Sequence, residues 1–176
     1  FPGVPGLAVT KRAPQGQADR FVAGRRADGQ PDFEVRGGAS DGAPLYVIKY
    51  VEPLEPNRSA LGFDAGSEPT RRRAIEQAVR TGQPTLSGPL TLVQDKEQGT
   101  GFLYLVPVYR GGAARSTPAQ REAALDVLIY APIVASELLG GTLDSVDADL
   151  VFSLFDGAAE TGPLVFSTDD TSAPAM

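Results

Sequence analysis

The stretch that decides the fold runs from Tyr46 to Tyr109 and reads YVIKYVEPLEPNRSALGFDAGSEPTRRRAIEQAVRTGQPTLSGPLTLVQDKEQGTGFLYLVPVY. Its first segment, residues 45–51, alternates in polarity as a β-strand does, which places Tyr46, Ile48 and Tyr50 on one face. A tight turn, a helix and two further strands follow. This order of elements predicts a helix packed on an antiparallel sheet.

The helix signals are concentrated between Ser67 and Gly82. Ser67 is the expected N-cap, Pro69 stands in the first turn, and apolar residues recur at helical spacing until Gly82 ends the segment. Segments 90–93 and 102–109 then flank a polar turn and predict an antiparallel hairpin. A helix on such a sheet is the plan of a PAS-like α+β fold.

Shorter elements are expected on either side of this stretch. They are strands at 6–10, 33–36 and 126–130, short helices at 19–26 and 132–139, and a further pair of strands at 148–155 and 164–167. We expect the strand at 126–130 to lie at a sheet edge. The last pair of strands fits a smaller, separate PAS-like unit.

The chain has 176 residues, and among them there is no His and no Cys. Without an imidazole, Ser-His-Asp hydrolases, Cys-His proteases and His-based zinc sites are excluded. Without thiols there is no disulfide framework. An acid–base enzyme would need two carboxylates that converge in a cleft, and the spacing of the acidic residues does not require that. We therefore expect no enzyme activity and no cofactor.

The net charge of −6 is distributed unevenly. Residues 122–176 hold ten of the 22 acidic residues and none of the 16 basic ones, so residues 1–121 carry a net charge of +4. The basic residues are not interleaved with aromatic ones, and nucleic-acid binding is not expected. Asp144, Asp147 and Asp149 lack the Gly and Glu of an EF-hand loop, so no metal site is expected either.

Several spaced motifs together resemble one known family. The pattern E-P-x-x-x-N-R-x-A-L-G-F-D from Glu52 to Asp64, the helix that Thr81-Gly82 closes, and the strand that ends in Pro107-Val108-Tyr109 resemble the CHASE domain. That family forms the extracytoplasmic sensory part of membrane histidine kinases, nucleotide cyclases and diguanylate cyclases. The resemblance implies two tandem PAS-like subdomains. Residues 1–112 would be the larger, membrane-distal, ligand-binding one and residues 113–176 the smaller, membrane-proximal one.

The resemblance also implies a cellular setting. The chain would be the periplasmic domain of a bacterial inner-membrane receptor, a histidine kinase or diguanylate cyclase, and would transmit a ligand-induced change across the membrane. Transmembrane and stalk helices, which this sequence lacks, would flank it in the parent protein, and the parent would be a homodimer. The chain begins with Phe1 and has no apolar leader, so we expect it to be a fragment of a longer protein.

Arg71 is the leading candidate for ligand contact. It belongs to the triplet Arg71-Arg72-Arg73 in the first turn of the helix, where the macrodipole disfavours cations, and its position falls on the apolar stripe. In plant cytokinin receptors the aligned position is an Asp that binds adenine, and an aligned ligand-contacting Thr corresponds to Leu105. The exchange of Asp for Arg disfavours adenine-type ligands and favours a small anion such as a carboxylate. Alternatively, Arg71 pairs with Asp64 or Glu68.

The remaining pocket candidates follow from strand alternation and family position. They are Tyr50, Phe63, Ser87, Val93 through its main chain, Tyr104 and Leu105. The aromatic ones could equally be core residues. A different class of function is therefore open, namely an interaction module whose core is filled by side chains and which responds to protein partners. The two readings differ in whether the space beside Arg71 is hollow.

Overall fold

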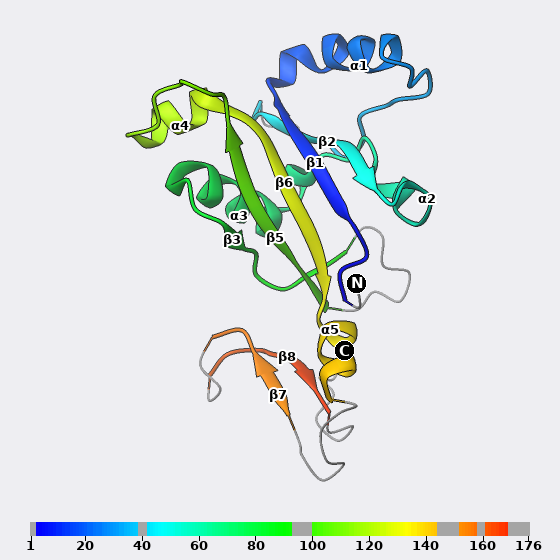
Figure 1. Ribbon diagram of the computed structural model, residues 1–176, viewed down its shortest axis with the longest axis vertical. Helices are drawn as coiled ribbons and strands as arrows, with labels where there is room; N and C mark the ends of the chain where they lie inside the picture. The colour runs from blue at the N-terminus through cyan, green and yellow to red at the C-terminus, as the bar shows by residue number, and fades with distance from the viewer. Residues whose placement is uncertain (1–2, 39–41, 93–99, 144–151, 158–160, 169–176) are drawn as a thin grey trace.

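The strands of the molecule's main part form one antiparallel sheet, in the order β2-β1-β6-β5-β3, with β4 pairing separately with β5. The computed structural model describes residues 3–38, 42–92, 100–143, 152–157 and 161–168 (Figure 1). The strands of this sheet are β1 (Leu7–Ala13), β2 (Leu45–Glu52), β3 (Thr85–Leu86), β4 (Leu90–Thr91), β5 (Thr100–Tyr109) and β6 (Leu125–Val134).

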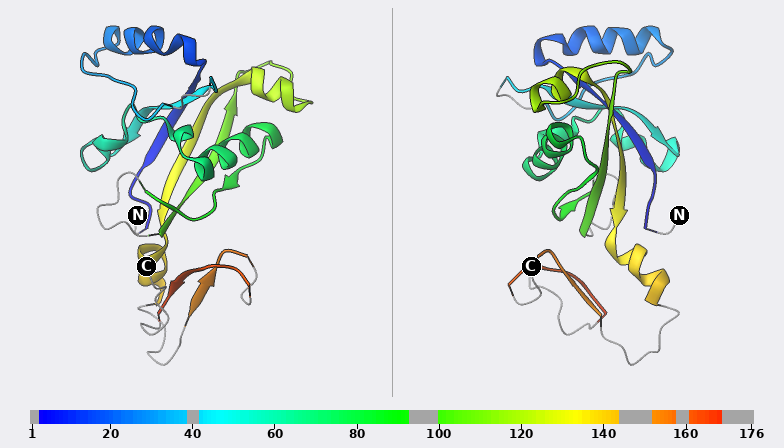
Figure 2. Two further views of the ribbon diagram at one scale, coloured as in Figure 1. Left: turned by 180° about the vertical axis from the view of Figure 1, so that it is seen from behind. Right: turned by 60° about the vertical axis from the view of Figure 1, so that its left-hand side comes forward.

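Helices cover the sheet unequally. The described helices are α1 (Ala18–Ala27), α2 (Leu54–Asn57), α3 (Pro69–Thr81), α4 (Pro118–Ala124) and α5 (Ala135–Leu143), with short 3-10 turns at Gln15–Gln17, Arg58–Ala60 and Ala65–Ser67. Figure 2 shows α3 lying along one side of the sheet and α1 crossing one end. We call the face under α3 the inner face and the opposite one the outer face. This architecture confirms the predicted PAS-like α+β fold.

The main hydrophobic core lies between α3 and the inner face. Ile75 and Val79 of α3 meet strand residues that are almost fully buried, among them Ile48, Leu105 and Leu128. Burying each such side chain stabilises the fold by roughly 1.5–3 kcal/mol. A smaller cluster lies under α1 and consists of Phe33, Leu45 and Val47. The two clusters hold the two helices on opposite sides of β2.

The ends of α3 show why this segment forms a helix. The carboxylate of Glu68 accepts hydrogen bonds from the backbone N–H groups of Thr70 (2.7 Å) and Arg71 (2.8 Å), so Glu68 is the N-cap and the prediction of Ser67 is wrong by one residue. Gly82 adopts φ 75° and closes the helix in the left-handed region, as predicted. Pro69 occupies the first turn, where a missing N–H has no consequence.

A bulge changes the expected faces of β2. Ile48 pairs with Thr10 and Tyr50 pairs with the preceding residue, Val9, so Lys49 is an extra residue opposite the β1 register. The strand alternation therefore reverses after Ile48. Tyr46 and Ile48 point into the inner core as predicted, but Tyr50 lies on the outer face and is 48% exposed. The sequence gives no signal for this insertion, and the predicted common face was wrong for Tyr50.

Three other predictions need correction. The strand at 126–130 is part of β6, which lies between β1 and β5 rather than at an edge. The helix expected from residue 132 begins only at Ala135, because β6 continues through a fully buried Pro132 to Val134. Segment 33–36 forms no strand, only an isolated bridge between Arg36 and Phe63.

The predicted second pair of strands is present as the hairpin β7 (Ser153–Phe155) and β8 (Leu164–Ser167), and residues 148–151 lie outside the described part of the chain. Figure 1 shows this hairpin beside α5, beyond the end of the large sheet. Because β6 completes the large sheet, that sheet includes residues on both sides of position 112. The division into a distal and a proximal subdomain stays a prediction.

Candidate functional site

Arg71 points from the first turn of α3 into the space between the helix and the sheet. Its residue surface is only 7% exposed. The neighbouring Arg72 instead donates to the carbonyl oxygen of Gly66 (2.7 Å), and Arg73 is exposed. Of the three consecutive arginines, Arg71 is therefore the one that the fold directs inward, as its place on the apolar stripe predicted.

A small cavity lies beside the Arg71 side chain. Its volume is about 10 Å³, and besides Arg71 it is lined by Ile48, Phe63, Ala65, Leu92, Leu103 and Tyr130. A water molecule needs roughly 10–15 Å³, so this space holds one water at most. A cavity therefore lies where the ligand pocket was expected, but it is much too small for a ligand. A small-molecule ligand would fit only if the surrounding side chains moved apart.

Few groups compensate the buried charge of Arg71. Its Nη2 donates to the carbonyl oxygen of Thr91 on β4, and its guanidinium carbon lies 5.6 Å from the centre of the Phe63 ring. Within the described residues it forms no ion pair with a carboxylate. A desolvated cation is costly unless it is paired, so this arginine carries a free-energy cost that its present contacts only partly offset.

The two acids expected as alternative partners of Arg71 have other roles. Asp64 is fully buried, and its Oδ1 accepts from the backbone N–H groups of Tyr46 (2.8 Å) and Gly66 (3.0 Å). It thereby fixes the loop to β2. Glu68 caps the helix with both carboxylate oxygens. Its charge acts on the Arg71 guanidinium only through space.

The pKa values around the cavity have identifiable causes. Burial lowers the pKa of Arg71, and the negative charge of Glu68 opposes this shift. Burial strongly raises the pKa of Tyr130, while the charge of Arg71 acts in the opposite direction. Burial would raise the pKa of Glu68, but the hydrogen bonds from Thr70 and Arg71 outweigh it and lower that pKa. The site therefore presents a cation and a neutral phenol in a nearly dry space.

The structure brings together only some of the predicted pocket residues. Phe63 lies beside Arg71 at the cavity. Leu105 is buried on the inner face, and the hydroxyl of Ser87 donates to Gly88 and accepts from the backbone of Leu103 (2.9 Å). Tyr104, 43% exposed, lies with Tyr50 on the outer face, away from the cavity. Val93 lies outside the described residues, as do Asp144, Asp147 and Asp149.

Sequence reasoning missed several residues at this site. Tyr130 was expected on an edge strand, and the central position of β6 instead directs it to the cavity. Leu92 and Leu103 were treated as ordinary strand residues, although both line the cavity. Their apolar character is a signal for burial only. Nothing in the sequence distinguishes a core leucine from one that faces a site.

A scan against protein-family models tests the resemblance that the motifs imply. The model described as the CHASE domain matches residues 1–166. The chain belongs to the CHASE domain family. CHASE domains are extracytoplasmic sensory domains and are not catalytic, so a sensory role in signal transduction follows for this chain. A search of curated proteins finds no match to it.

The motif that carries the CHASE resemblance has a structural role. Residues 52–64 leave β2, form α2 and a 3-10 turn, and return to β2 through the backbone bonds of Gly62 and Phe63 to Ile48 (2.9 and 3.0 Å). Gly62 has φ 78°, and a Cβ there would lie 2.0 Å from the carbonyl oxygen of Glu34. This loop positions Phe63 beside Arg71. Among the described residues, no helix is long and apolar enough to span a bilayer.

Proposed function

We propose that this CHASE domain binds a small anionic molecule, such as a carboxylate, beside Arg71. One observation carries the proposal: Arg71 is 7% exposed, and its guanidinium forms no ion pair among the described residues. A bidentate carboxylate would supply the missing counter-charge. Perturbed, desolvated ionisable groups are concentrated at functional sites, which supports the same interpretation. Tyr50 and Tyr104 have no part in this site.

Ligand entry requires a local change, because the present cavity of about 10 Å³ is too small. The Nη2 of Arg71 already donates a hydrogen bond to the carbonyl oxygen of Thr91, so an incoming anion competes with that oxygen for the donor. Breaking that bond removes the described hydrogen bond between α3 and β4. A ligand shifts the conformational equilibrium only if it binds the opened state more tightly, and the exposed Arg71 guanidinium would provide that difference in affinity.

The change at β4 has a route to the second unit. β4 pairs with β5, which pairs along its whole length with β6, and α5 continues directly from β6. The carbonyl oxygen of Gly3 accepts from the backbone N–H of Val134 (2.8 Å) at this junction. In Figure 1 the N-terminal end of the chain lies beside α5. The segment before β1 and the end of β6 therefore meet at this junction, where a change in the large sheet would pass to α5.

At the level of the parent protein, the proposal follows the family. The domain would be periplasmic, held at the bacterial inner membrane by flanking helices of the parent protein. It would dimerise through those helices in a histidine kinase or diguanylate cyclase. Ligand binding would then alter kinase or cyclase output across the membrane.

A thermal-shift screen tests the ligand proposal. Acetate, pyruvate, succinate, glutamate and adenine are added to the wild-type domain, to Arg71→Met and to Arg73→Ala. Arg73 is the matched control, because it is the exposed arginine of the same turn and, within the described residues, its side chain bonds only to Thr70 (3.2 Å). A ligand at 100 times its Kd raises the free energy of unfolding by about 2.7 kcal/mol. We expect a carboxylate to stabilise the wild type and Arg73→Ala but not Arg71→Met. An adenine shift that survives Arg71→Met would overturn the proposal.

The small cavity favours a second candidate function. A core that side chains nearly fill fits an interaction module that responds to protein partners, without a small ligand. In that case no compound would shift the melting temperature of a cooperatively unfolding wild-type domain, and Arg71→Met would leave the signalling output of the full-length receptor unchanged.

A further inference from the structure

A groove on the outer side of the molecule has the properties of a second ligand site. It lies between one face of α1 and the end of β1, and its volume is about 370 Å³, within the usual range of small-molecule sites. We call it the α1 groove. The lining residues from α1 and its two flanking cap residues recur at helical spacing, at positions 17, 20, 21, 24, 25 and 28. This surface is therefore one continuous side of the helix facing the sheet.

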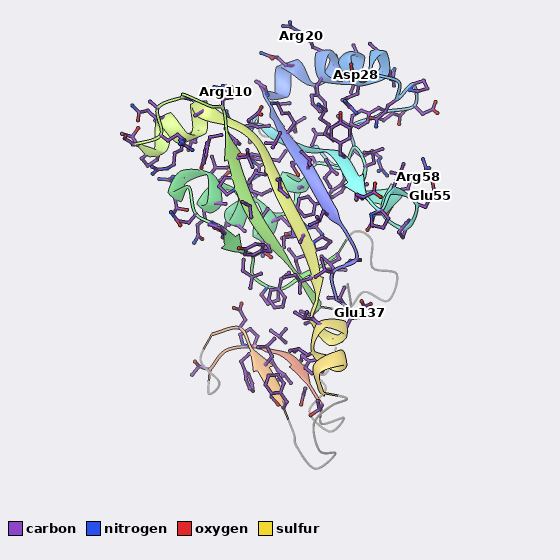
Figure 3. The ribbon with its side chains drawn as sticks, viewed as in Figure 1. Arg20, Asp28, Glu55, Arg58, Arg110 and Glu137 are labelled. Atoms are coloured by element: carbon purple, nitrogen blue, oxygen red, sulfur yellow. The ribbon has the colours of Figure 1, made fainter. Side chains whose placement is uncertain are left out.

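The charges around the α1 groove are strongly one-sided. Its charged lining residues are Lys11, Arg12, Arg20, Arg25, Lys49 and a single acid, Asp28. The whole chain carries a net charge of −6, so the groove is a local exception. Figure 3 labels Arg20 on α1 and Asp28 at its C-terminal end, at the other end of the large sheet from Glu137 on α5. Clustered cations in a concave surface concentrate anions from solution.

Some of these cations are already paired within the protein. Arg25 pairs with Asp28 (3.1 Å), and Lys11 pairs with Asp126 at the rim. Arg12, Arg20 and Lys49 form no ion pair with any acid of the described residues. Lys49 also lies over the Tyr50 ring at 5.0 Å and close to Asp126, and Arg12 lies close to Tyr46 of the inner face, so the excess positive charge at the groove is partly compensated.

The floor of the groove is rigidly built. Arg25 is 3% exposed, donates to Gln30 (2.8 Å) and to the hydroxyl of Tyr50 (3.1 Å), and stacks over the Tyr50 ring at 4.6 Å. These contacts fix α1 against β2. The hydrogen bond from Arg25, supported by the nearby charge of Lys49, lowers the pKa of Tyr50, which is consistent with a positive potential here. A preorganised site binds without a large ordering cost.

The geometry points to binding of a small multivalent anion, of phosphate or carboxylate type, in the α1 groove. Arg20 of α1 and Lys49 of β2 both line the groove, so cations from the helix and from the sheet border the space that a compact anion would occupy. Ala13, Pro14 and Phe21 add an apolar wall for a short hydrocarbon portion. The inference does not rest on the Arg71 site, because Arg71 lies on the inner face of the sheet.

Isothermal titration of the domain with pyrophosphate and, separately, with citrate at low ionic strength tests this inference. Pyrophosphate tests for a phosphate-type ligand, and citrate tests for a carboxylate-type ligand. The variants are Arg20→Ala, Lys49→Met and Arg71→Met, with Arg73→Ala as the matched control. Arg20 and Arg73 are both exposed arginines on helices without an ion pair among the described residues, and both substitutions remove one charge. Backbone amide NMR shifts during the titration locate the bound probe.

We expect saturable binding of at least one probe at one site per chain, with shifts concentrated on α1 and β1. Arg20→Ala and Lys49→Met are each expected to weaken binding about 5-fold or more, and Arg73→Ala about 2-fold or less. Absence of saturable binding for both probes overturns the inference. So does equal weakening by Arg20→Ala and Arg73→Ala, or loss of binding in Arg71→Met with no effect of Arg20→Ala. The last result would place the probe at Arg71 and so support the proposed carboxylate site, whereas the other two leave the carboxylate shift expected there untouched.

Discussion

Two buried arginines on opposite sides of the sheet make the most instructive comparison in this CHASE domain. Arg25 under α1 is 3% exposed and Arg71 under α3 is 7% exposed, so the fold removes both from water. Arg25 donates to Asp28, Gln30 and Tyr50 and lies over two aromatic rings. Among the described residues, Arg71 has one carbonyl acceptor and one ring.

The difference separates a structural arginine from a functional one. A buried cation whose donors are satisfied strengthens the fold, whereas one that lacks partners weakens it and needs another reason to be present. We propose that in this sensory domain the reason is a ligand. The contacts of Arg25 hold α1 against the sheet, and α1 also lines the proposed anion groove. On the α3 side, the proposed ligand contact is the buried arginine itself.

The largest effect is expected for Arg25→Met. The substitution keeps much of the side-chain volume but removes the hydrogen bonds to Asp28, Gln30 and Tyr50 and the cation–π contacts. We expect the free energy of unfolding to fall by about 2–3 kcal/mol, measured by urea denaturation. An unchanged stability would remove the distinction between the two arginines.

Glu68→Ala tests whether the nearest acid supports the helix or the arginine. Loss of the N-cap is expected to cost about 1 kcal/mol at pH 7. The folded pKa of Glu68 is lowered, so its contribution is fully present above the unfolded value of about 4.3 and is lost as the pH falls through the lower folded value. The stability difference between wild type and variant should therefore shrink below about pH 4.

The same substitution in the Arg71→Met background provides the control. If Glu68 acts as a cap, the loss of about 1 kcal/mol stays the same without the guanidinium. A loss that disappears in the double variant would mean that Glu68 and Arg71 form a structural ion pair, which would contradict the comparison.

Asp28→Asn is expected to have the smallest effect. The Asp28 side chain is 64% exposed, and its ion pair with Arg25 is screened by solvent. Exposed pairs contribute roughly 0–1 kcal/mol, so we expect a loss below about 0.5 kcal/mol by urea denaturation. Because Asp28 is the one acid in the lining of the α1 groove, the same variant should bind pyrophosphate or citrate more tightly than wild type.

Local sequence signals were sufficient for the layers of the fold. The alternation of residues 45–48, the cap and glycine of α3 and the turn before β5 identified a helix on an antiparallel sheet, because each depends on neighbouring residues only. The central position of β6 depends on pairing with β1, more than a hundred residues earlier in the chain. No local pattern specifies such a partner.

The candidate site was predictable in part for the same reason. Arg71 was found because helical periodicity and the unfavourable first-turn position are both local features. Tyr50 was misplaced because the bulge at Lys49 is a property of the register between two strands. Tyr130 was missed because its role follows from the position of β6. The near closure of the cavity depends on side-chain packing, which no single segment determines.

Urea denaturation of wild type and Arg71→Met, in the absence of ligand, tests the central claim most directly. Arg71 forms no ion pair among the described residues, and the carbonyl of the exposed Thr91 can turn to water when the arginine is removed. The account predicts that Arg71→Met is as stable as wild type or more stable by about 1 kcal/mol, because an apolar side chain of similar size replaces a poorly compensated charge. A loss of about 2 kcal/mol or more, similar to that expected for Arg25→Met, would show that Arg71 is a structural residue and would contradict the account.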